Sequence, residues 1–379
     1  MKILHVASFS GNIGDNASHM GLRKVLSLLV KCPEITELEI RDFYKNAGLK
    51  DKKYFDQSYV KLCNEFDLII WGGGGYLDYW VPNSSTGTTF DITIDVMNQI
   101  NPPTLITSVG CVPGKPVPEG NKAKFNDFLA YIASSNNFHL MLRNDGSFKH
   151  IKENFSKSLA EAFSVILDNA FHYEYEPSAG LPLTRDYVAM NIAYDQILMT
   201  GESAAILAED DYYQEIVKIV NYIIVDCKLD VCFIPHISAD IKAIDRVISK
   251  LSDKYVRKNI LIAPYMSGNA GANYNFGIYK NSVLSIGNRF HANVCGISLG
   301  VKTIGLAALD RITQLYSSLD LLDSCVTVDH GFSKDVIHKI SQNIGINSSN
   351  SSNSLSKKLN KLKSNSISEY KDILTTFFK

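Results

Sequence analysis

The sequence lacks a strong charge bias and an ordered cysteine pattern. Its 379 residues carry 38 Lys and Arg against 39 Asp and Glu, so the formal net charge is −1. That balance gives no global attraction to nucleic acid or to an acidic membrane, and a bound anion must be held by local groups. The 7 cysteines are an odd number without a C-x-x-C spacing. They argue against a disulfide framework or a zinc site and favour reduced thiols.

The sequence also lacks a hydrophobic run suited to export or to membrane insertion. The apolar N-terminal run, Met1–Phe9, is too short for a signal peptide. The longest apolar stretch, Ala292–Leu309, contains Lys302 and three glycines, which indicates a buried helix followed by a buried strand. We therefore expect a cytoplasmic protein with no integral membrane segment.

The sequence does contain a regular alternation of strand-like and helix-like segments. Many strand-like segments are apolar on both faces, as in a parallel sheet that is covered on both sides. A polar segment at 174–185 interrupts the alternation, which then restarts. The pattern predicts an α/β protein with two doubly wound, Rossmann-like domains at 1–178 and 185–345, followed by a Ser/Asn-rich link and a C-terminal helix at 346–379. Strands are expected at Lys2–Ser8, Ile35–Arg41, Phe66–Trp71, Thr104–Val109, Phe138–Leu142, Ser164–Leu167, Tyr187–Ile192, Asp230–Pro235, Asn259–Ala263, Val283–Ile286 and Val301–Leu306. In the second domain, helices are expected at Glu202–Lys228 and Ala239–Lys254.

The most informative segment joins the strand at Val283–Ile286 to a helix expected over His291–Leu299. Arg289 and His291 lie where the strand gives way to the helix, and ligands of open α/β sheets bind at such junctions. Residues two apart in extended backbone point the same way, so both side chains are expected to face one ligand. Asn288 is expected to cap the helix. An Arg, a His and a helix N-terminus together predict an anion site with a titratable partner.

Two further side chains lie at strand ends. His236 and Arg143 each end a predicted strand, and Ser147 lies in the next helical turn after Arg143. An arginine in this position can clamp a carboxylate or a phosphate. A lone histidine is more often a structural residue, and Arg143 could instead form a surface ion pair with Asp145. Both interpretations stay open for His236 and for Arg143.

Two glycine-containing segments follow strands in the first half of the chain. Residues 11–16, Gly-Asn-Ile-Gly-Asp-Asn, follow the first strand, and four glycines occupy Gly72–Gly75. Glycine allows backbone amides to approach a ligand closely. The first segment could equally be a tight turn with Asp15 as a helix cap, and its spacing is not that of a nucleotide-binding loop. The aromatic residues Tyr76, Tyr79 and Trp80 come next, a composition suited to stacking on sugars, although core packing is the commoner use of aromatic side chains.

Taken in order from residue 3 to about residue 310, these motifs resemble the polysaccharide pyruvyl transferase family. The ordered set is fairly specific, above all the Arg-x-His-Ala sequence before a helix that ends at glycine. The family usually has proline at the position of Asn169. The matching pieces are Gly11-Asn12-Ile13-Gly14-Asp15, Gly72–Gly75, Ser108-Val109-Gly110, Arg143 with Ser147, Asp168-Asn169-Ala170-Phe171, Ile234-Pro235-His236 with Asp240, and Arg289-Phe290-His291-Ala292.

The resemblance implies a GT-B-like fold with two domains facing across a cleft. It implies an enzyme that moves the enolpyruvyl group of phosphoenolpyruvate onto two hydroxyls of a sugar, which forms a cyclic ketal and releases phosphate. The sugar would belong to a bacterial-type polysaccharide or cell-surface glycan, and a lipid-linked acceptor would bring the enzyme transiently to the inner face of the membrane. No metal or cofactor is expected beyond phosphoenolpyruvate as co-substrate, since arginines and helix ends can supply positive charge.

The resemblance also suggests roles for individual residues. His291, Arg289 and His236 are expected to be catalytic, with His291 as the acid and His236 as its rival. The second domain is expected to hold the donor and the first mainly the sugar. Donor contacts are expected from Arg143, Asn288 and Ser147. Acceptor contacts are expected from Asn12, Asp15, Asn16, Gly73, Gly74 and Tyr76.

Two other functions remain open. A GT-B glycosyltransferase with a nucleotide-sugar donor is disfavoured because no glutamate lies between Glu215 and Glu369, so the paired glutamates common in the donor half of one large group are missing. No Asp-x-Asp occurs either, which disfavours the metal–diphosphate site of the other main glycosyltransferase fold. Glycosyltransferases of the sialyl or heptosyl type, however, need neither pattern. A non-catalytic glycan-binding protein is disfavoured by the presence of Arg289 and His291. The sequence does not specify the acceptor sugar, the ketal position, the stereochemistry or the oligomeric state.

Overall fold

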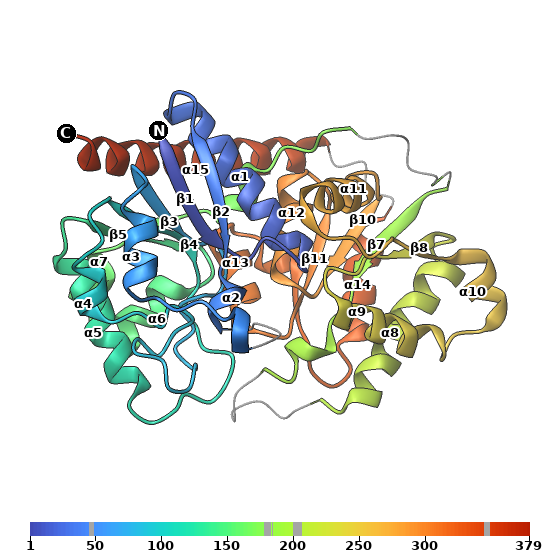
Figure 1. Cartoon of the computed structure of the whole chain (residues 1–379). Coiled ribbons are helices and arrows are strands. Elements are labelled where there is room, and N and C mark those ends of the chain that lie inside the picture. Colours follow the sequence, from blue (N-terminus) through green and yellow to red (C-terminus); the bar gives the residue numbers. More distant parts are fainter. Residues whose placement is uncertain (45–48, 178–182, 184, 200–206, 345–348) are drawn as a thin grey trace. The chain divides into compact units, whose positions relative to one another are not determined.

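The chain forms two compact units, which are not simply its two halves (Figure 1). The computed structural model describes residues 1–44, 49–177, 183, 185–199, 207–344 and 349–379. Unit 1 comprises Met1–Phe9, Gly21–His172 and Lys361–Lys379, and unit 2 comprises Ser10–Met20 and Tyr173–Asn360. Residues 10–20 therefore group with the second unit although they follow the first strand of the first.

Unit 1 is built on a six-stranded parallel sheet with the order β2-β1-β3-β4-β5-β6. Its strands are β1 (Lys2–Ala7), β2 (Glu34–Glu39), β3 (Leu68–Trp71), β4 (Thr104–Val109), β5 (Phe138–Arg143) and β6 (Ser164–Ile166). β1 pairs with β2 on one side and with β3 on the other, so the direction of winding reverses between β1 and β3. In doubly wound sheets, ligands bind near the carboxyl ends of the strands at such a reversal.

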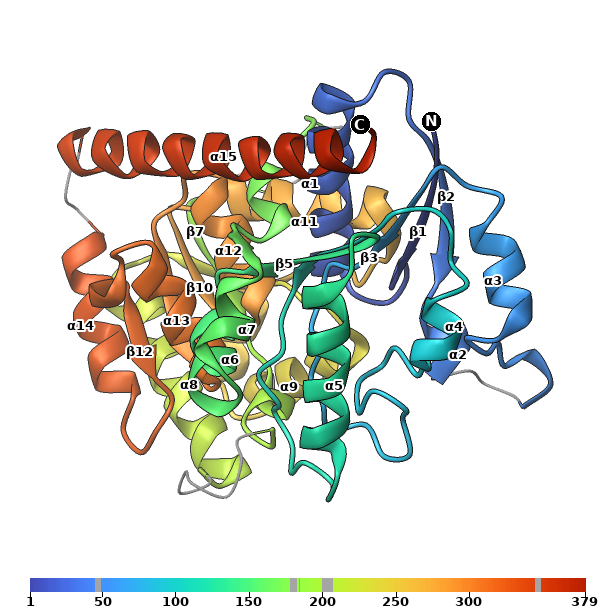
Figure 2. The ribbon, with the colours of Figure 1, turned by 90° about the vertical axis from the view of Figure 1, so that its left-hand side faces the viewer.

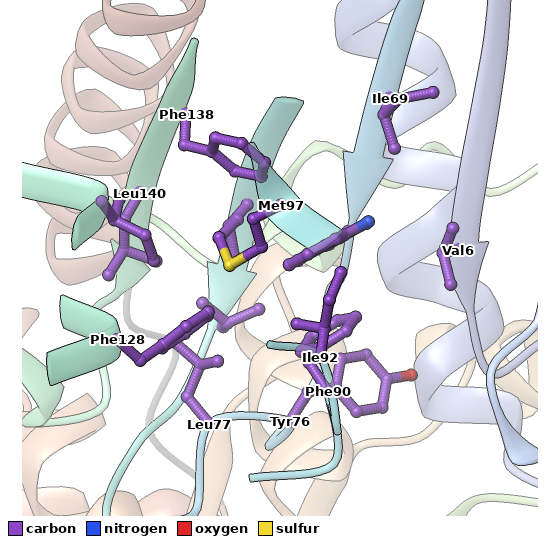
Figure 3. Packing of buried hydrophobic residues seen from close by; sticks show 14 of the residues in the cluster. Val6, Ile69, Tyr76, Leu77, Phe90, Ile92, Met97, Phe128, Phe138 and Leu140 are labelled. Atoms are coloured by element: carbon purple, nitrogen blue, oxygen red, sulfur yellow. The ribbon is translucent and has the colours of Figure 1, made fainter. Parts of the chain in front are cut away.

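Apolar side chains cover both faces of this sheet, as the sequence of β3 requires. Ile69 and Trp71 face one hydrophobic cluster, of which Figure 3 shows Ile69 and Phe90. The Trp71 ring stacks on Phe90 with 4.5 Å between centroids. Leu68 and Ile70 face the opposite cluster. This alternation is the two-residue period of a strand that is buried on both sides.

Helices connect these strands and cover the sheet. In Figure 2, α5 and α6 lie beside β5, and α7 packs against α5 and α6. The connecting elements are α2 (Arg41–Tyr44), η1 (Leu49–Asp51), α3 (Gln57–Cys63), α4 (Ile94–Met97), α5 (Asn121–Ser134), α6 (Ser147–Asn154), α7 (Lys157–Glu161) and η2 (Asn169–His172).

Unit 2 repeats the architecture with a second six-stranded parallel sheet, in the order β12-β11-β10-β7-β8-β9. The reversal of winding here falls between β7 and β10. The strands are β7 (Tyr187–Asn191), β8 (Asp230–Phe233), β9 (Ile260–Ile262), β10 (Leu284–Gly287), β11 (Thr303–Ala307) and β12 (Cys325–Thr327). The connecting elements are η3 (Tyr194–Gln196), α8 (Glu209–Val225), α9 (Ser238–Ile248), α10 (Asp253–Asn259), α11 (Gly268–Lys280), α12 (Phe290–Ser298), α13 (Asp310–Ser318), η4 (Leu322–Ser324) and α14 (Ser333–Asn343).

Two helices contribute residues to both units. Residues of α1 (Ile13–Leu29) as far as Met20 group with unit 2, and the remainder groups with unit 1. The helix α15 (Ser349–Phe377) divides in the same way after Asn360.

The C-terminal part of α15 is anchored in unit 1 by a buried tyrosine. The Tyr370 hydroxyl donates to Asn169 Oδ1 at 2.7 Å and also contacts the Thr107 hydroxyl, and its ring lies in the cluster that contains Ile70. The amide of Asn169, at the position where the family usually has proline, thus binds this helix. The Ser/Asn tract was predicted to be a flexible link, but α15 begins within it at Ser349, and residues 347 and 348 lie outside the described residues.

Among the described residues, no helix combines the length and the apolar character needed to cross a membrane.

Candidate functional site

The reversal of winding in unit 2 positions the predicted catalytic arginine. β10 ends at Gly287, and Arg289 is the N-cap residue of α12, with extended backbone angles. Its backbone N–H donates to Asn191 Oδ1 at 2.9 Å, and Asn191 ends the neighbouring strand β7. Arg289 therefore lies at the carboxyl ends of the two strands between which the winding reverses, where a ligand is expected.

Two carboxylates hold the guanidinium of Arg289. Arg289 Nε donates to both Asp240 oxygens at 2.9 Å, and Nη2 lies 2.7 Å from Asp195 Oδ1. Asp240 is fully buried, whereas the Asp195 side chain is 38% exposed. Although burial alone would lower the pKa of Arg289, Asp240 and Asp195 raise that pKa above its ordinary value. The arginine therefore stays charged, with one fixed and one more accessible counter-ion.

His236 lies in the same cluster but is held in the neutral form. Its ring is fully buried, packs edge-on against Phe276 at 5.6 Å, and has Nε2 2.9 Å from the Tyr279 hydroxyl. Burial lowers the pKa of His236 well below its ordinary value, and the nearby charges of Arg289 and His291 lower it further. A neutral imidazole is a far weaker acid than an imidazolium, so His236 is a poor rival for the role of general acid.

His291 lies in the first turn of α12 and packs against the start of α1. His291 Nδ1 is 3.7 Å from Asp15 Oδ1, and the histidine is 6% exposed. A Cβ atom on Gly14 would lie only 2.5 Å from His291 Cβ and 2.7 Å from Nδ1, so a side chain at that position would displace the imidazole. Glycine at position 14 thus allows α1 to approach the histidine closely.

Four helix N-termini meet around these side chains, all within unit 2. α1 contacts α12 through Asp15 and His291, and it contacts α11 through Asn16 Nδ2 and Asn269 Oδ1 at 3.4 Å. α9 contributes Asp240. Among the described residues, no side chain caps the N-terminus of α11 or of α12, and the dipole of a helix favours negative charge at such an end. The arrangement can hold an anion and can supply a proton to it.

Asn288, which was predicted to cap α12 and to bind the donor, instead holds the strand ends together. Its Oδ1 accepts from Ala193 N and from the Tyr212 hydroxyl, both at 3.1 Å, and its Nδ2 donates to Leu306 O at 3.0 Å. The N-cap residue of the helix is Arg289. The prediction that Asn288 caps the helix was therefore wrong, and these contacts account for its complete burial without a ligand.

Arg143 and Ser147 come together in unit 1, in surroundings that do not favour anion binding. Arg143 Nε lies 2.6 Å from Asp145 Oδ2, Nη1 lies 3.6 Å from Asp168 Oδ2, and the Ser147 hydroxyl donates to Asp145. Burial opposes the charge of Arg143, but Asp145 and Asp168 raise its pKa above the ordinary value. The surface ion pair considered for Arg143 and Asp145 is in fact a buried one, with both residues at most 3% exposed.

Close packing accounts for much of the glycine and aromatic segment in unit 1. A Cβ atom on Gly72 would lie 2.2 Å from Thr107 O, and one on Gly74 would lie 2.9 Å from the Tyr76 ring. The Tyr76 hydroxyl accepts from Ser8 N at 2.8 Å, and the side chain is buried in the core. Gly73 lies in the same buried segment. The predicted acceptor contacts of Gly73, Gly74 and Tyr76 stay predictions, and Tyr76 serves the core.

The other three residues predicted to bind the acceptor lie with the catalytic candidates. Asn12, Asp15 and Asn16 belong to unit 2, where Asn12 Oδ1 accepts from Gly14 N at 3.0 Å. Sequence reasoning placed them in the first domain because they follow β1. It also missed Asp195 and Asn269, whose importance depends on the strand order and on the packing of α11 and cannot be read from a local motif.

Comparison with known proteins agrees with this architecture. A family model described as polysaccharide pyruvyl transferase matches residues 12–310. No curated protein matches the chain. A glycosyltransferase from Rickettsia africae is similar in structure, with a TM-score of 0.60 and 12% identity over 98% of each chain.

Two sugar-nucleotide epimerase structures are also similar. A putative UDP-N-acetylglucosamine 2-epimerase from Listeria monocytogenes has a TM-score of 0.54 and 11% identity, with 96% of this chain and 90% of that one covered. UDP-GlcNAc 2-epimerase from Methanocaldococcus jannaschii has a TM-score of 0.52 and 10% identity, with 92% and 94% covered. At such identities these likenesses concern the fold alone. With the two parallel sheets, they confirm the predicted two-domain, GT-B-like α/β fold.

Proposed function

Because the chain belongs to the polysaccharide pyruvyl transferase family, we propose that it transfers the enolpyruvyl group of phosphoenolpyruvate to two hydroxyls of a sugar. The product is a pyruvate ketal on a polysaccharide or cell-surface glycan, and phosphate is released. The proposal needs no resident metal ion or further cofactor. The family itself is one of transferases, so the chain is an enzyme of that class.

The observation that carries the proposal is the meeting of Arg289 and His291 with four helix N-termini in unit 2. Phosphoenolpyruvate carries a carboxylate and a phosphate, and helix N-termini and a guanidinium favour both groups. The cluster also contains a histidine that can exchange a proton. Phosphoenolpyruvate, an anionic donor that reacts after protonation, matches this combination of an anion site and a proton donor.

The reaction needs a proton at the start. The methylene carbon of phosphoenolpyruvate must be protonated before C2 becomes electrophilic, and we assign that proton to His291 because His236 is held neutral. The first sugar hydroxyl adds to C2 and loses its proton, which returns to the imidazole. The neighbouring hydroxyl then displaces phosphate and closes the ketal, and its proton leaves with the phosphate. A well-placed general acid contributes about 10²–10⁴ in rate.

Arg289 would stabilise the negative charge of the donor in this scheme. Asp240 fixes the guanidinium through both Nε and Nη2, whereas Asp195 contacts Nη2 alone and does so from a partly exposed position. An incoming carboxylate or phosphate replaces Asp195 at Nη2 and leaves the contacts with Asp240 in place. A buried arginine with one exchangeable counter-ion is thus suited to bind and release an anion in each cycle.

The acceptor rests on the family resemblance. We propose a sugar hydroxyl pair on a free or lipid-linked oligosaccharide, with transient approach to the inner membrane face in the second case. Carboxylates surround Arg143, which disfavours the predicted contacts of Arg143 and Ser147 with an anionic donor.

The test combines donor, acceptor and one variant. Wild-type protein is incubated with phosphoenolpyruvate and candidate oligosaccharides, and released phosphate and pyruvyl addition are measured by colorimetry and mass spectrometry. His291→Ala should lower phosphate release by about 10²–10⁴ without changing the melting temperature. The exposed His338 of α14 provides the control, because His338→Ala should keep wild-type turnover.

Three outcomes would contradict the proposal. One is near wild-type turnover in His291→Ala, and another is the absence of any pyruvyl product. The third is thermal stabilisation by UDP, GDP or CMP sugars but not by phosphoenolpyruvate, which would favour a glycosyltransferase instead.

A further inference from the structure

We infer that Asp15 is a positioning residue for His291, the general acid. The Asp15 carboxylate holds the imidazole with Nδ1 toward itself and so directs Nε2 to the donor. This inference rests on the proposed function, which supplies the phosphoenolpyruvate donor. The geometry of Asp15 and His291 does not depend on that function and lies within unit 2. It gives Asp15 a role different from the acceptor contact predicted from the sequence.

The position of Asp15 is fixed by the local structure of α1. It lies in the first turn of the helix, where a carboxylate is favoured by the helix dipole. The preceding turn is closed by the bond from Gly14 N to Asn12 Oδ1, and Ile13 N donates to His236 O at 3.4 Å. The carboxylate is therefore presented by a backbone that is tied to the strand end which carries His236.

His291 and Asp15 are held together by packing as well as by charge. Gly14 lies so close to the imidazole that even a methyl group would overlap Cβ, Cγ and Nδ1. The distance of 3.7 Å from Nδ1 to Asp15 Oδ1 exceeds that of a hydrogen bond but lies in the range of an ion pair. Apo enzymes often show such lengthened contacts, which shorten when the substrate binds.

The carboxylate has a defined effect on each step of proton transfer. When His291 is protonated, Asp15 stabilises the imidazolium and keeps Nδ1–H toward itself. Nε2–H is then the proton that passes to the methylene carbon, and Nε2 later receives the proton of the attacking hydroxyl. Asp15 keeps its charge throughout and exchanges no proton.

The cluster that contains His291 includes other titratable and charged groups that bear on its pH profile. His236 follows β8, Arg289 precedes α12, Asp240 lies on α9 and Asp195 lies on η3. Arg289 is paired with both of these aspartates, and His236 is held neutral. Asp15, by contrast, lies within ion-pair distance of His291 itself.

The experiment compares Asp15→Asn and Asp15→Glu with wild type in phosphate release from phosphoenolpyruvate. For Asp15→Asn we expect kcat to fall about 10- to 100-fold, a part of the contribution of a general acid, with little change in KM for phosphoenolpyruvate. The alkaline limb of its kcat profile should move to lower pH, because an unsupported imidazolium loses its proton more easily. Asp15→Glu should recover part of kcat and of that limb.

The control is Asp253→Asn, which removes another first-turn aspartate in unit 2, one that forms an exposed ion pair with Arg257. It should leave kcat and its pH profile unchanged. If Asp15 only stabilises the N-terminus of α1, Asp15→Asn would lower the melting temperature while kcat and the alkaline limb stay as in wild type. That result would overturn the inference.

A second readout separates the inference from the proposed function. The ring protons of His291, assigned by their loss in His291→Ala, are titrated by NMR in wild type and in Asp15→Asn. A midpoint at lower pH in Asp15→Asn supports the pairing even if phosphoenolpyruvate gives no turnover, in which case only the proposed function fails. An unchanged midpoint overturns the pairing, whatever the substrate.

Discussion

The two units each place a buried arginine near the carboxyl end of a parallel strand, but only one of these arginines lies in surroundings suited to an anion. In unit 1, Arg143 is enclosed by Asp145 and Asp168, both fully or almost fully buried. In unit 2, Arg289 has one buried and one partly exposed counter-ion, and helix N-termini and a histidine lie around it. An arginine at a strand end is therefore weak evidence of function until its counter-ions are known.

The largest difference should be in stability. Arg143→Ala leaves two buried carboxylates without their cation, and we expect the free energy of unfolding to fall by about 3–5 kcal/mol. Arg289→Ala should cost less, because it leaves one fully buried carboxylate, Asp240, whereas Asp195 is partly solvated.

Urea unfolding of both variants measures this difference. Arg257→Ala serves as the control, since it breaks an exposed pair and should change the free energy of unfolding by less than about 0.5 kcal/mol. If Arg289→Ala proved the more destabilising, the contrast between a structural and a functional arginine would be lost.

A smaller difference concerns the pH dependence of stability. His172 is buried near Asp168, and burial together with Lys363 on α15 lowers its pKa to about 4. Below pH 6.5 the unfolded chain binds a proton at this residue and the folded chain does not, so the stability it contributes is present above that pH and lost as the pH falls toward 4.

His172→Gln should reduce the slope of the free energy of unfolding against pH by about 1.4 kcal/mol per pH unit between pH 6.5 and 4, which corresponds to one proton. Chemical denaturation at several pH values provides the measurement, with the exposed His338→Gln as control. Unit 2 has a counterpart in His236, whose pKa is also lowered. A slope that does not change in His172→Gln would show that this ring is protonated in the folded protein.

The smallest expected effect is on donor binding. Asp195→Asn removes the exchangeable counter-ion of Arg289, so KM for phosphoenolpyruvate should fall a few-fold, equivalent to about 1 kcal/mol for a partly exposed pair. Initial rates at varied donor concentration measure it, and Asp253→Asn is again the control. A raised KM would mean that Asp195 orients the guanidinium instead of competing for it.

Much of the fold could be predicted from periodicity and apolar content. All eleven predicted strands are present, with ends displaced by up to two residues, and the short edge strand β12 was missed. A single helix was predicted over 239–254. The structure instead has α9, which ends at Ile248, and α10, which begins after its N-cap residue Ser252. The helix predicted from Glu202 to Lys228 is found from Glu209 to Val225, and residues 202–206 lie outside the described residues.

The site could be predicted only in part, because local motifs do not reveal the partners of a side chain. The strand-to-helix junction correctly indicated where Arg289 and His291 lie. The argument from extended backbone was wrong, since His291 already belongs to the helix. The contact between Arg143 and Asp168 depends on strand order. The position of Asp15 beside His291 depends on the path of α1. No short sequence pattern encodes either.

The path of α1 has a consequence for dissecting the protein. A fragment that begins after the polar segment at 174–185 would retain the whole β7–β12 sheet with both Arg289 and His291, and by sequence it would look like a complete donor-binding domain. It would nevertheless lack Asp15, which precedes the whole first sheet in the sequence but groups with unit 2. Cutting at the obvious linker would thus separate the histidine from its carboxylate, and only restoring the first thirty or so residues, in cis or as a separate peptide, would reunite them.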